Sequence, residues 1–202
     1  WLKGRLEFTL NFMKTISYLF IVYSFYGYLM KYSLVHGSIV FNKDPCGLLD
    51  TVYTYIISLD EYQPITAEQC ILLSSSPLYQ LNGTQIIGTQ PSLMLIQRQA
   101  FVDVLNSADW LLIVLILEID VYLQIRGKLT KRIIQISRVI KIILYSILFI
   151  NAIYWGIEGT FLAFWDAFLW LIAFIFIEMN LLGLQAEDNK DDCHMNFKEV
   201  HT

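Results

Sequence analysis

Four long runs of apolar residues alternate with polar stretches along the chain. The runs cover residues 15–30, 110–125, 133–157 and 160–184. A helix needs about 20 mostly apolar residues to cross the hydrocarbon core of a bilayer, and each run reaches or approaches that length with its flanks. The pattern therefore predicts an all-α integral membrane protein with four transmembrane helices.

The stretch between the first two runs, residues 31–108, contains several helix signals. Asp44-Pro45 has the residue types of an N-cap followed by the first helical position. The next apolar residues return at helical spacing, at Leu48, Leu49, Val52, Ile56 and Leu59. Residues 66–69 have the pattern of a capping box, and residues 92–105 form an amphipathic stretch that can continue directly into the second run. The sequence thus predicts either a small helical cap outside the membrane or helices that lie on the bilayer surface.

Composition supports a membrane location and suggests an orientation. Hydrophobic residues make up 56% of the chain and charged residues only 16%, whereas soluble domains carry about 25% charged residues. Lys and Arg are frequent in residues 126–132 and 1–14 and absent from the turn at 156–159. Since cytoplasmic loops are enriched in these residues, we expect a multi-pass protein of the plasma membrane or bacterial inner membrane, with both termini in the cytoplasm.

These features divide the chain into four predicted parts. Residues 1–31 form a cytoplasmic N-terminus and the first span, and residues 32–108 form the extracytoplasmic segment. Residues 109–184 form a three-span bundle, and residues 185–202 form an acidic cytoplasmic tail with the composition of a solvated end.

Ionisable residues inside or close to the predicted spans are the first candidates for a functional site. They are Glu118, Asp120, Arg138, Lys141, Asp166 and Glu178. A charge in hydrocarbon is costly, so such residues pair with one another or contact water. Asp120 and Arg138 each lie nine residues from Leu129 in the basic loop, which places them at one depth in a helical hairpin. We therefore predict that a carboxylate neutralises Arg138, with Asp120 as the first choice and Glu178 as the second.

The two acids of the second run face different directions. Glu118 and Asp120 are two residues apart, about 200° around a helix, so only one of them can face the basic pair of the third run. The other acid then faces another helix or another subunit. Asp166 has no basic residue at its depth, so we expect it to be protonated or to contact water.

Cysteine and histidine residues suggest little chemistry. Cys46 and Cys70 both fall in the predicted extracytoplasmic segment, where disulfides persist, and the sequence leaves both a bridge and two free thiols open. Cys193, His194 and His201 lie in the polar tail without the ligand spacing of a structural metal site. No metal or cofactor site is predicted, because nucleotide-binding and hydrolase motifs are missing and no predicted span contains a histidine.

Two functions from different classes fit these observations. The first is a non-catalytic accessory or structural subunit of a membrane complex, held by intramembrane charge pairs. Its partners would be the lipid bilayer and either other membrane subunits or further copies of the chain. The second is a proton or cation pathway, a channel or transporter component that uses the charged residues of the bundle. The lack of a catalytic motif argues against an enzyme, and the lack of a basic domain argues against nucleic-acid binding.

Overall fold

A computed structural model describes residues 2–128, 130–158, 161–162 and 164–176, with side chains from residue 8 onward. The chain divides into two compact units, residues 1–122 and 123–202, and each unit is described separately. The elements of the first unit are α1 (Leu2–His36), β1 (Ser38–Phe41), the 3-10 helix η1 (Pro45–Leu48), β2 (Thr54–Ser58), β3 (Glu61–Pro64), α2 (Ala67–Ser74), β4 (Leu78–Leu81), β5 (Ile86–Thr89) and most of α3 (Gln90–Ile125).

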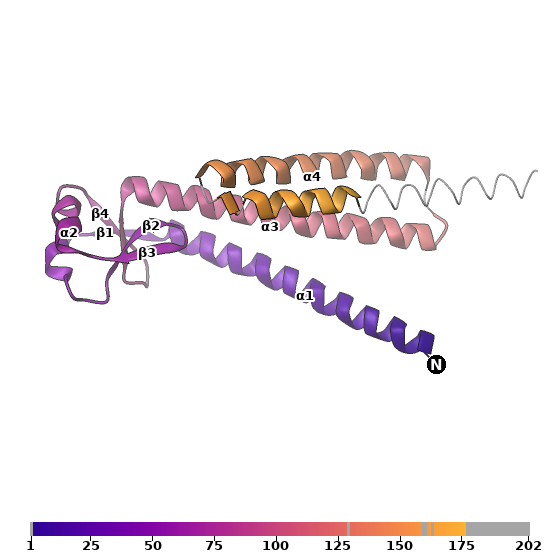
Figure 1. The fold of residues 1–202 in the computed structure, drawn as a ribbon, viewed down its shortest axis with the longest axis horizontal. Helices are drawn as coiled ribbons and strands as arrows, with labels where there is room; N and C mark the ends of the chain where they lie inside the picture. The colour runs from indigo at the N-terminus through magenta and orange to yellow at the C-terminus, as the bar shows by residue number, and fades with distance from the viewer. Residues whose placement is uncertain (1, 129, 159–160, 163, 177–202) are drawn as a thin grey trace, which may run out of the picture. The chain divides into compact units, whose positions relative to one another are not determined.

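The two long helices of the first unit enter and leave a small domain, residues 37–89, which we call the sheet domain (Figure 1). Its five strands have the order β1-β4-β5-β2-β3. Neighbouring strands are antiparallel except β2 and β5, which are parallel. Asn82 and Gly83 lie in the turn between β4 and β5, and Gly83 has a positive φ of 74°, which glycine adopts without strain.

The prediction of an all-α protein is wrong, because the segment read as helical contains this sheet. The apolar residues at 48–59 do recur at helical spacing, but only η1 forms a helical turn there, and β2 follows. Residues 54–57, TYII, are each aromatic or β-branched, and such side chains favour the pleated surface of a strand.

Two apolar cores lie against the sheet domain. One joins Val35 of α1 and Ile96 of α3 to strand residues such as Ile56. The other joins η1 and α2 to the sheet through Leu48, Leu73 and Ile87, among others. Successive strand residues contact different cores, as expected for opposite faces of one sheet. The C-terminal end of α1 and the N-terminal end of α3 therefore belong to the core of the sheet domain and attach this domain to the two helices.

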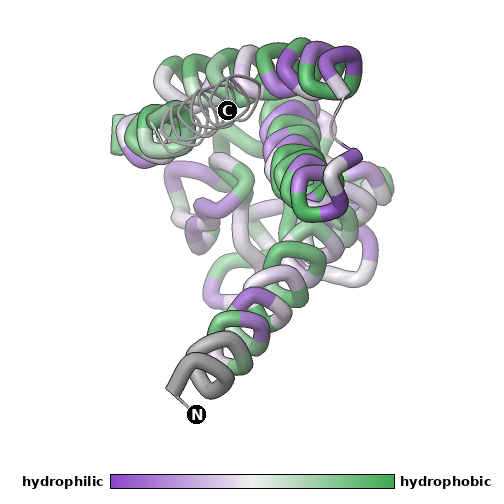
Figure 2. The backbone as a smooth tube through the Cα atoms, turned by 90° about the vertical axis from the view of Figure 1, so that its right-hand side faces the viewer, coloured by the Kyte–Doolittle hydropathy of each residue, from purple (hydrophilic) through white to green (hydrophobic). Residues whose placement is uncertain are grey.

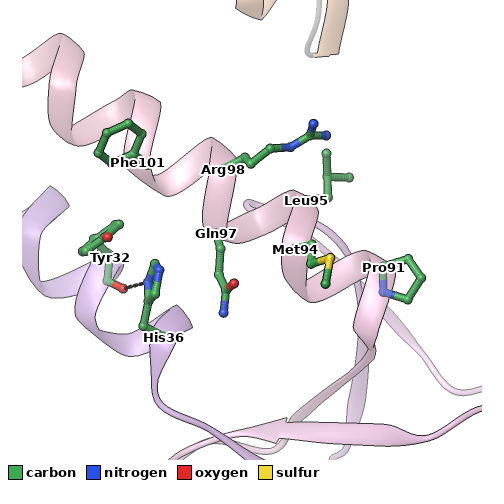
Figure 3. Close-up of a pocket in the computed structure, with 8 residues that line it drawn as sticks. All are labelled: Tyr32, His36, Pro91, Met94, Leu95, Gln97, Arg98 and Phe101. Atoms are coloured by element: carbon green, nitrogen blue, oxygen red, sulfur yellow. Dashed lines mark hydrogen bonds between the residues drawn. The ribbon is translucent and has the colours of Figure 1, made fainter.

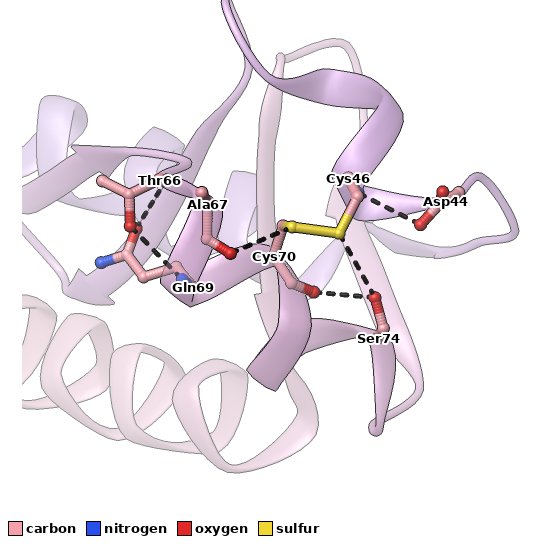
Figure 4. The surroundings of a disulfide bond; sticks show 7 residues. All are labelled: Asp44, Cys46, Thr66, Ala67, Gln69, Cys70 and Ser74. Carbon is pink, nitrogen blue, oxygen red and sulfur yellow. Dashed lines mark hydrogen bonds between the residues drawn. A yellow bond between two sulfur atoms is a disulfide. The ribbon is translucent and has the colours of Figure 1, made fainter.

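Two local predictions within the sheet domain are confirmed. Asp44 caps η1 by accepting a hydrogen bond from the Cys46 backbone N–H, with Pro45 at the first position. Thr66 and Gln69 form both hydrogen bonds of the capping box that opens α2. Figure 4 shows these caps on either side of a disulfide that joins Cys46 to Cys70, with their Cα atoms 4.9 Å apart.

The second unit contains α4 (Lys131–Glu158) and a shorter apolar helix, Phe164–Phe176. The buried residues of α4 lie on one face: Ser137, Lys141, Leu144, Leu148, Asn151 and Ala152. In Figure 2 the tube of α4, at the top, is mostly hydrophobic, with its hydrophilic positions gathered toward one end.

The prediction of four spans is also wrong. Among the described residues, only α3 and α4 are long and apolar enough to cross a membrane. The long helix α1 contains the first predicted run, but tyrosine, serine, threonine and glycine lower the hydropathy of residues 15–30. The described helix of the fourth run, Phe164–Phe176, is about 20 Å long at 1.5 Å per residue, shorter than the hydrocarbon core. The predicted amphipathic stretch at 92–105 does continue into the second run, because α3 is one uninterrupted helix.

Candidate functional site

The helices α1 and α3 lie antiparallel and contact one another at several heights. Close to the sheet domain, Gln97 Nε2 donates a hydrogen bond to the Val35 carbonyl at 3.1 Å. One turn further along, the rings of Tyr32 and Phe101 lie 6.3 Å apart. Far from the sheet domain, Lys14 contacts Glu118. Residues that contact one another thus shift in opposite directions along the two helices, so α1 and α3 run antiparallel.

A polar cluster joins the two helices at the end far from the sheet domain. Lys14 Nζ lies 2.6 Å from Glu118 Oε2, and the Tyr18 hydroxyl donates a hydrogen bond to Glu118 Oε1. Lys14 and Tyr18 are four residues apart, so they share one face of α1 and reach the same carboxylate. We call Lys14, Tyr18 and Glu118 the Glu118 cluster. It satisfies both oxygens of Glu118 with donors from a segment about one hundred residues earlier in the chain.

A second ion pair fixes the other end of α1. Lys31 Nζ lies 2.5 Å from Asp60 Oδ1 in the turn between β2 and β3. Tyr62 donates to the Leu59 carbonyl in the same turn. The residues of α1 between the Glu118 cluster and this pair, 15–30, contain no formal charge. An ion pair therefore lies at each end of the uncharged run of α1.

Asp109 of α3 is a buried carboxylate in the first unit. Only 3% of its surface is exposed, and neither carboxylate oxygen has a hydrogen-bond partner among the described residues. Buried polar groups are normally paired, so an unpaired carboxylate points to a proton, a water molecule or an ion as its ligand. Asp109 was not among the candidate residues predicted from the sequence.

The structure assigns different surroundings to the other predicted site residues. Asp120 is half-buried on α3, whereas Lys141 is buried and Arg138 is exposed on α4. Asp166 is exposed on the helix Phe164–Phe176, and Glu178 lies outside the described residues. Asp120 and Arg138 belong to different units, so their pairing stays a prediction. Glu118 has Lys14 and Tyr18 of another helix, α1, as its observed partners.

The part of the chain that the structure describes contains no group of three His, Cys, Asp or Glu side chains arranged to hold a metal ion. Cys46 and Cys70 are joined to one another and are not available as thiolate ligands. Lys14 and Tyr18 were missed as site residues because the basic flank of the first run was read only as a topology signal. Their spacing of four residues at the edge of an apolar helix was the available clue. Comparisons with protein-family models, with curated proteins and with solved structures returned no match for this chain.

Proposed function

We propose that this chain is a non-catalytic, multi-pass membrane protein that serves as an accessory or structural subunit of a membrane complex. The helices α3 and α4 cross the bilayer, and α1 runs antiparallel to α3 and contacts it. The sheet domain lies on the extracytoplasmic side, and the basic loop at 126–132 lies in the cytoplasm, where the positive-inside rule places it.

The exposure of the helices supports a membrane environment. Only 22% of the apolar stretch of α3 and 17% of that of α4 are buried within the chain. A core helix of a water-soluble protein would be mostly buried. Large apolar side chains are also exposed along α1, such as Phe20 at 68% and Tyr23 at 75%. An apolar surface of this extent needs lipid or protein to cover it.

The Glu118 cluster is the observation that carries the proposal of a subunit. The side chains of Lys14 and Glu118 remain 45% and 38% exposed although they lie on long, largely apolar helices. Exposed polar groups in a bilayer are costly unless another protein surface covers them. A neighbouring subunit would shield the Glu118 cluster from lipid and accept hydrogen bonds from the remaining N–H donors of Lys14.

Native mass spectrometry tests this proposal on protein extracted from its own membrane in a mild detergent. We expect a species of defined mass and fixed stoichiometry, well above the 23.5 kDa of one chain. Replacing Lys14 and Glu118 together, with methionine and leucine, should reduce that species while the chain remains in the membrane fraction. A single chain of 23.5 kDa as the main species under all extraction conditions would contradict a subunit role.

A proton or cation pathway is the second candidate, and the burial of Asp109 favours it. A carboxylate with no hydrogen-bond partner among the described residues can take up and release a proton without first breaking a salt bridge. Asp166, which the sequence predicts to be protonated or in contact with water, is exposed in the second unit. The pathway hypothesis therefore now rests on Asp109.

We predict that Asp109→Asn abolishes any proton flux, because asparagine keeps the shape of the side chain but does not titrate. The flux is measured in proteoliposomes with an internal pH-sensitive dye under an imposed pH gradient. Asp166→Asn is the matched control and should retain the wild-type flux. Wild-type protein that shows no flux under any gradient or voltage would reject the pathway and leave the subunit proposal standing.

A further inference from the structure

The turn between β4 and β5 contains the one Asn-Gly pair of the sequence, Asn82-Gly83. Every other asparagine of the chain is followed by a residue that carries a side chain. The Thr84 backbone N–H donates to the Leu81 carbonyl at 3.1 Å and closes the turn, and both Asn82 and Gly83 are exposed. The pair therefore lies at the tip of a hairpin that water reaches.

Two groups at this tip are not engaged by the rest of the fold. Within the part of the chain that the structure describes, the side-chain amide of Asn82 and the backbone N–H of Gly83 have no hydrogen-bond partner. A Cβ built on Gly83 would meet no heavy atom within 4 Å, so the surrounding space is open. Glycine also rotates more freely than any other residue. The Gly83 nitrogen can therefore approach Cγ of Asn82 without displacing a neighbour.

These two groups can react with one another. The Gly83 nitrogen gives up its proton and attacks Cγ of Asn82, so a C–N bond forms and a cyclic imide results. The side-chain nitrogen takes up that proton and leaves as ammonia. Water then opens the ring at one of its two carbonyl carbons. Opening at Cγ gives aspartate, and opening at the main-chain carbonyl gives isoaspartate, whose main chain passes through Cγ. The sequence of steps consumes water, releases ammonia and involves no oxidation or reduction.

The other asparagines of the described structure provide a contrast. Asn42 is exposed in a loop of the same sheet domain, but Lys43 follows it and its side chain restricts the backbone. Asn106 and Asn151 lie inside α3 and α4, where the helical hydrogen bonds fix the nitrogen of the next residue. Asn82 therefore combines a following glycine with exposure and a turn.

Asn82 also holds the end of β4 against the start of β1. Its backbone N–H donates to the Gly37 carbonyl at 2.8 Å, and its Cβ lies 3.7 Å from the position that a Cβ on Gly37 would take. Gly37 follows α1, whose last residue, His36, bonds to the Tyr32 carbonyl (Figure 3). The C-terminal end of a helix carries partial negative charge, so a carboxylate at position 82 is unfavourable there. Isoaspartate, in addition, lengthens the main chain of the turn.

We propose that Asn82 is a site of spontaneous modification, at which its amide converts to aspartate and isoaspartate and loosens the contact of β4 with the start of β1. The reaction needs no partner other than water. It depends neither on the role of the chain as a subunit nor on a proton pathway.

Incubation of the full chain in mild detergent at neutral pH tests the reaction. Digestion with pepsin in acid, where the imide does not form, and mass spectrometry of the peptides give the fraction of carboxylate at each asparagine. We expect Asn82 to convert about tenfold faster than Asn42, because glycine lowers the barrier to ring closure. Gly83→Ala should slow the conversion of Asn82 by a similar factor. Lys43→Gly, which leaves the turn intact, should accelerate the conversion of Asn42 by about tenfold.

Three results would overturn the modification site. The first is equal conversion of Asn82 and Asn42 in the wild type. The second is a rate at Asn42 that Lys43→Gly does not change, because the reaction would then not depend on a following glycine. The third is a glycan on Asn82 in protein from its own membrane. Residues 82–84 also match the acceptor sequence for N-linked glycans, and a glycosylated amide does not take this route.

Hydrogen exchange tests the loosening separately. Asn82→Asp reproduces one product and should speed exchange in peptides that cover residues 37–41 by about threefold. Gln85→Glu adds the same charge at an exposed position before β5, on the side of β4 that faces away from β1, and should leave this exchange unchanged. Equal exchange in Asn82→Asp and the wild type would show that the modification does not loosen β1.

Discussion

Replacing both Cys46 and Cys70 with alanine is expected to lower the free energy of unfolding of the sheet domain by about 3 kcal/mol. The disulfide closes a loop of 24 residues, so its loss returns considerable conformational freedom to the unfolded chain. Cys70 is only 4% exposed and belongs to the core between the sheet, η1 and α2. The domain between α1 and α3 is small, and small domains have little core to offset such a loss.

Hydrogen exchange measured by mass spectrometry on the full chain reports this loss locally. Peptides that cover residues 38–89 should lose protection by about 100-fold, and peptides from α4 should not change. Alanine is chosen because serine would bury a hydroxyl group in the core. Cys193→Ala is the control for the loss of a thiol and should leave the protection of the sheet domain unchanged. Unchanged protection in the double variant would mean that the bridge contributes nothing to the domain.

The errors in predicting the sheet domain have a clear physical origin. Residues 48–59 carry apolar side chains at positions that fit a helical period, and a short apolar run fits a buried strand equally well. The deciding information was local composition: β2 is rich in tyrosine and isoleucine, and Asn82-Gly83 is the residue pair most typical of a tight hairpin turn. Both signals were in the sequence, but neither was used to predict a strand.

Features determined by neighbours in sequence were predicted correctly. The capping box at Thr66 and Gln69 depends on residues three positions apart, and the cap at Asp44 on residues two positions apart. The pairing of β2 with β5 joins segments about thirty residues apart, and no local pattern specifies it. Local patterns also do not specify the core that brings the C-terminal end of α1 and the N-terminal end of α3 onto the sheet.

The charged residues show most directly that local patterns do not specify contacts between distant segments. Depth matching compared only the two arms of the hairpin around the basic loop, and the sequence did not identify which other helix an acid facing away from the third run would contact. The observed partners, Lys14 and Tyr18, lie on α1 at the same height once α1 and α3 are antiparallel. That alignment depends on the sheet domain, because it connects the two helices and fixes their relative register. An error in the sheet domain thus carried over into the prediction of the charge pairs.

Glu118→Leu is expected to weaken the association of α1 with α3 by about 2 kcal/mol in a bilayer, because Lys14 then keeps its charge without a carboxylate partner. Lys14→Met should cost a similar amount by leaving Glu118 with only the Tyr18 hydroxyl. The double variant should recover much of the loss, because two apolar side chains suit the surroundings of apolar helices. The free energy of unfolding is measured in bicelles by titration with a denaturing detergent, for the wild type, both single variants and the double variant.

These four proteins form a double-mutant cycle, and its coupling energy distinguishes an ion pair within the membrane from one on a water-exposed surface. We expect a coupling of about 3 kcal/mol, larger than the loss in either single variant, whereas exposed ion pairs in water rarely exceed about 1 kcal/mol. Glu61→Leu removes a carboxylate from the exposed strand β3 and serves as the matched control, with an expected change of less than about 0.5 kcal/mol. Tyr18→Phe should weaken the cluster less than either charge deletion, because the ion pair remains. Strictly additive effects of Lys14→Met and Glu118→Leu would mean that the two residues do not hold the helices together. The proposal of a charge-linked membrane subunit would then lose its main support.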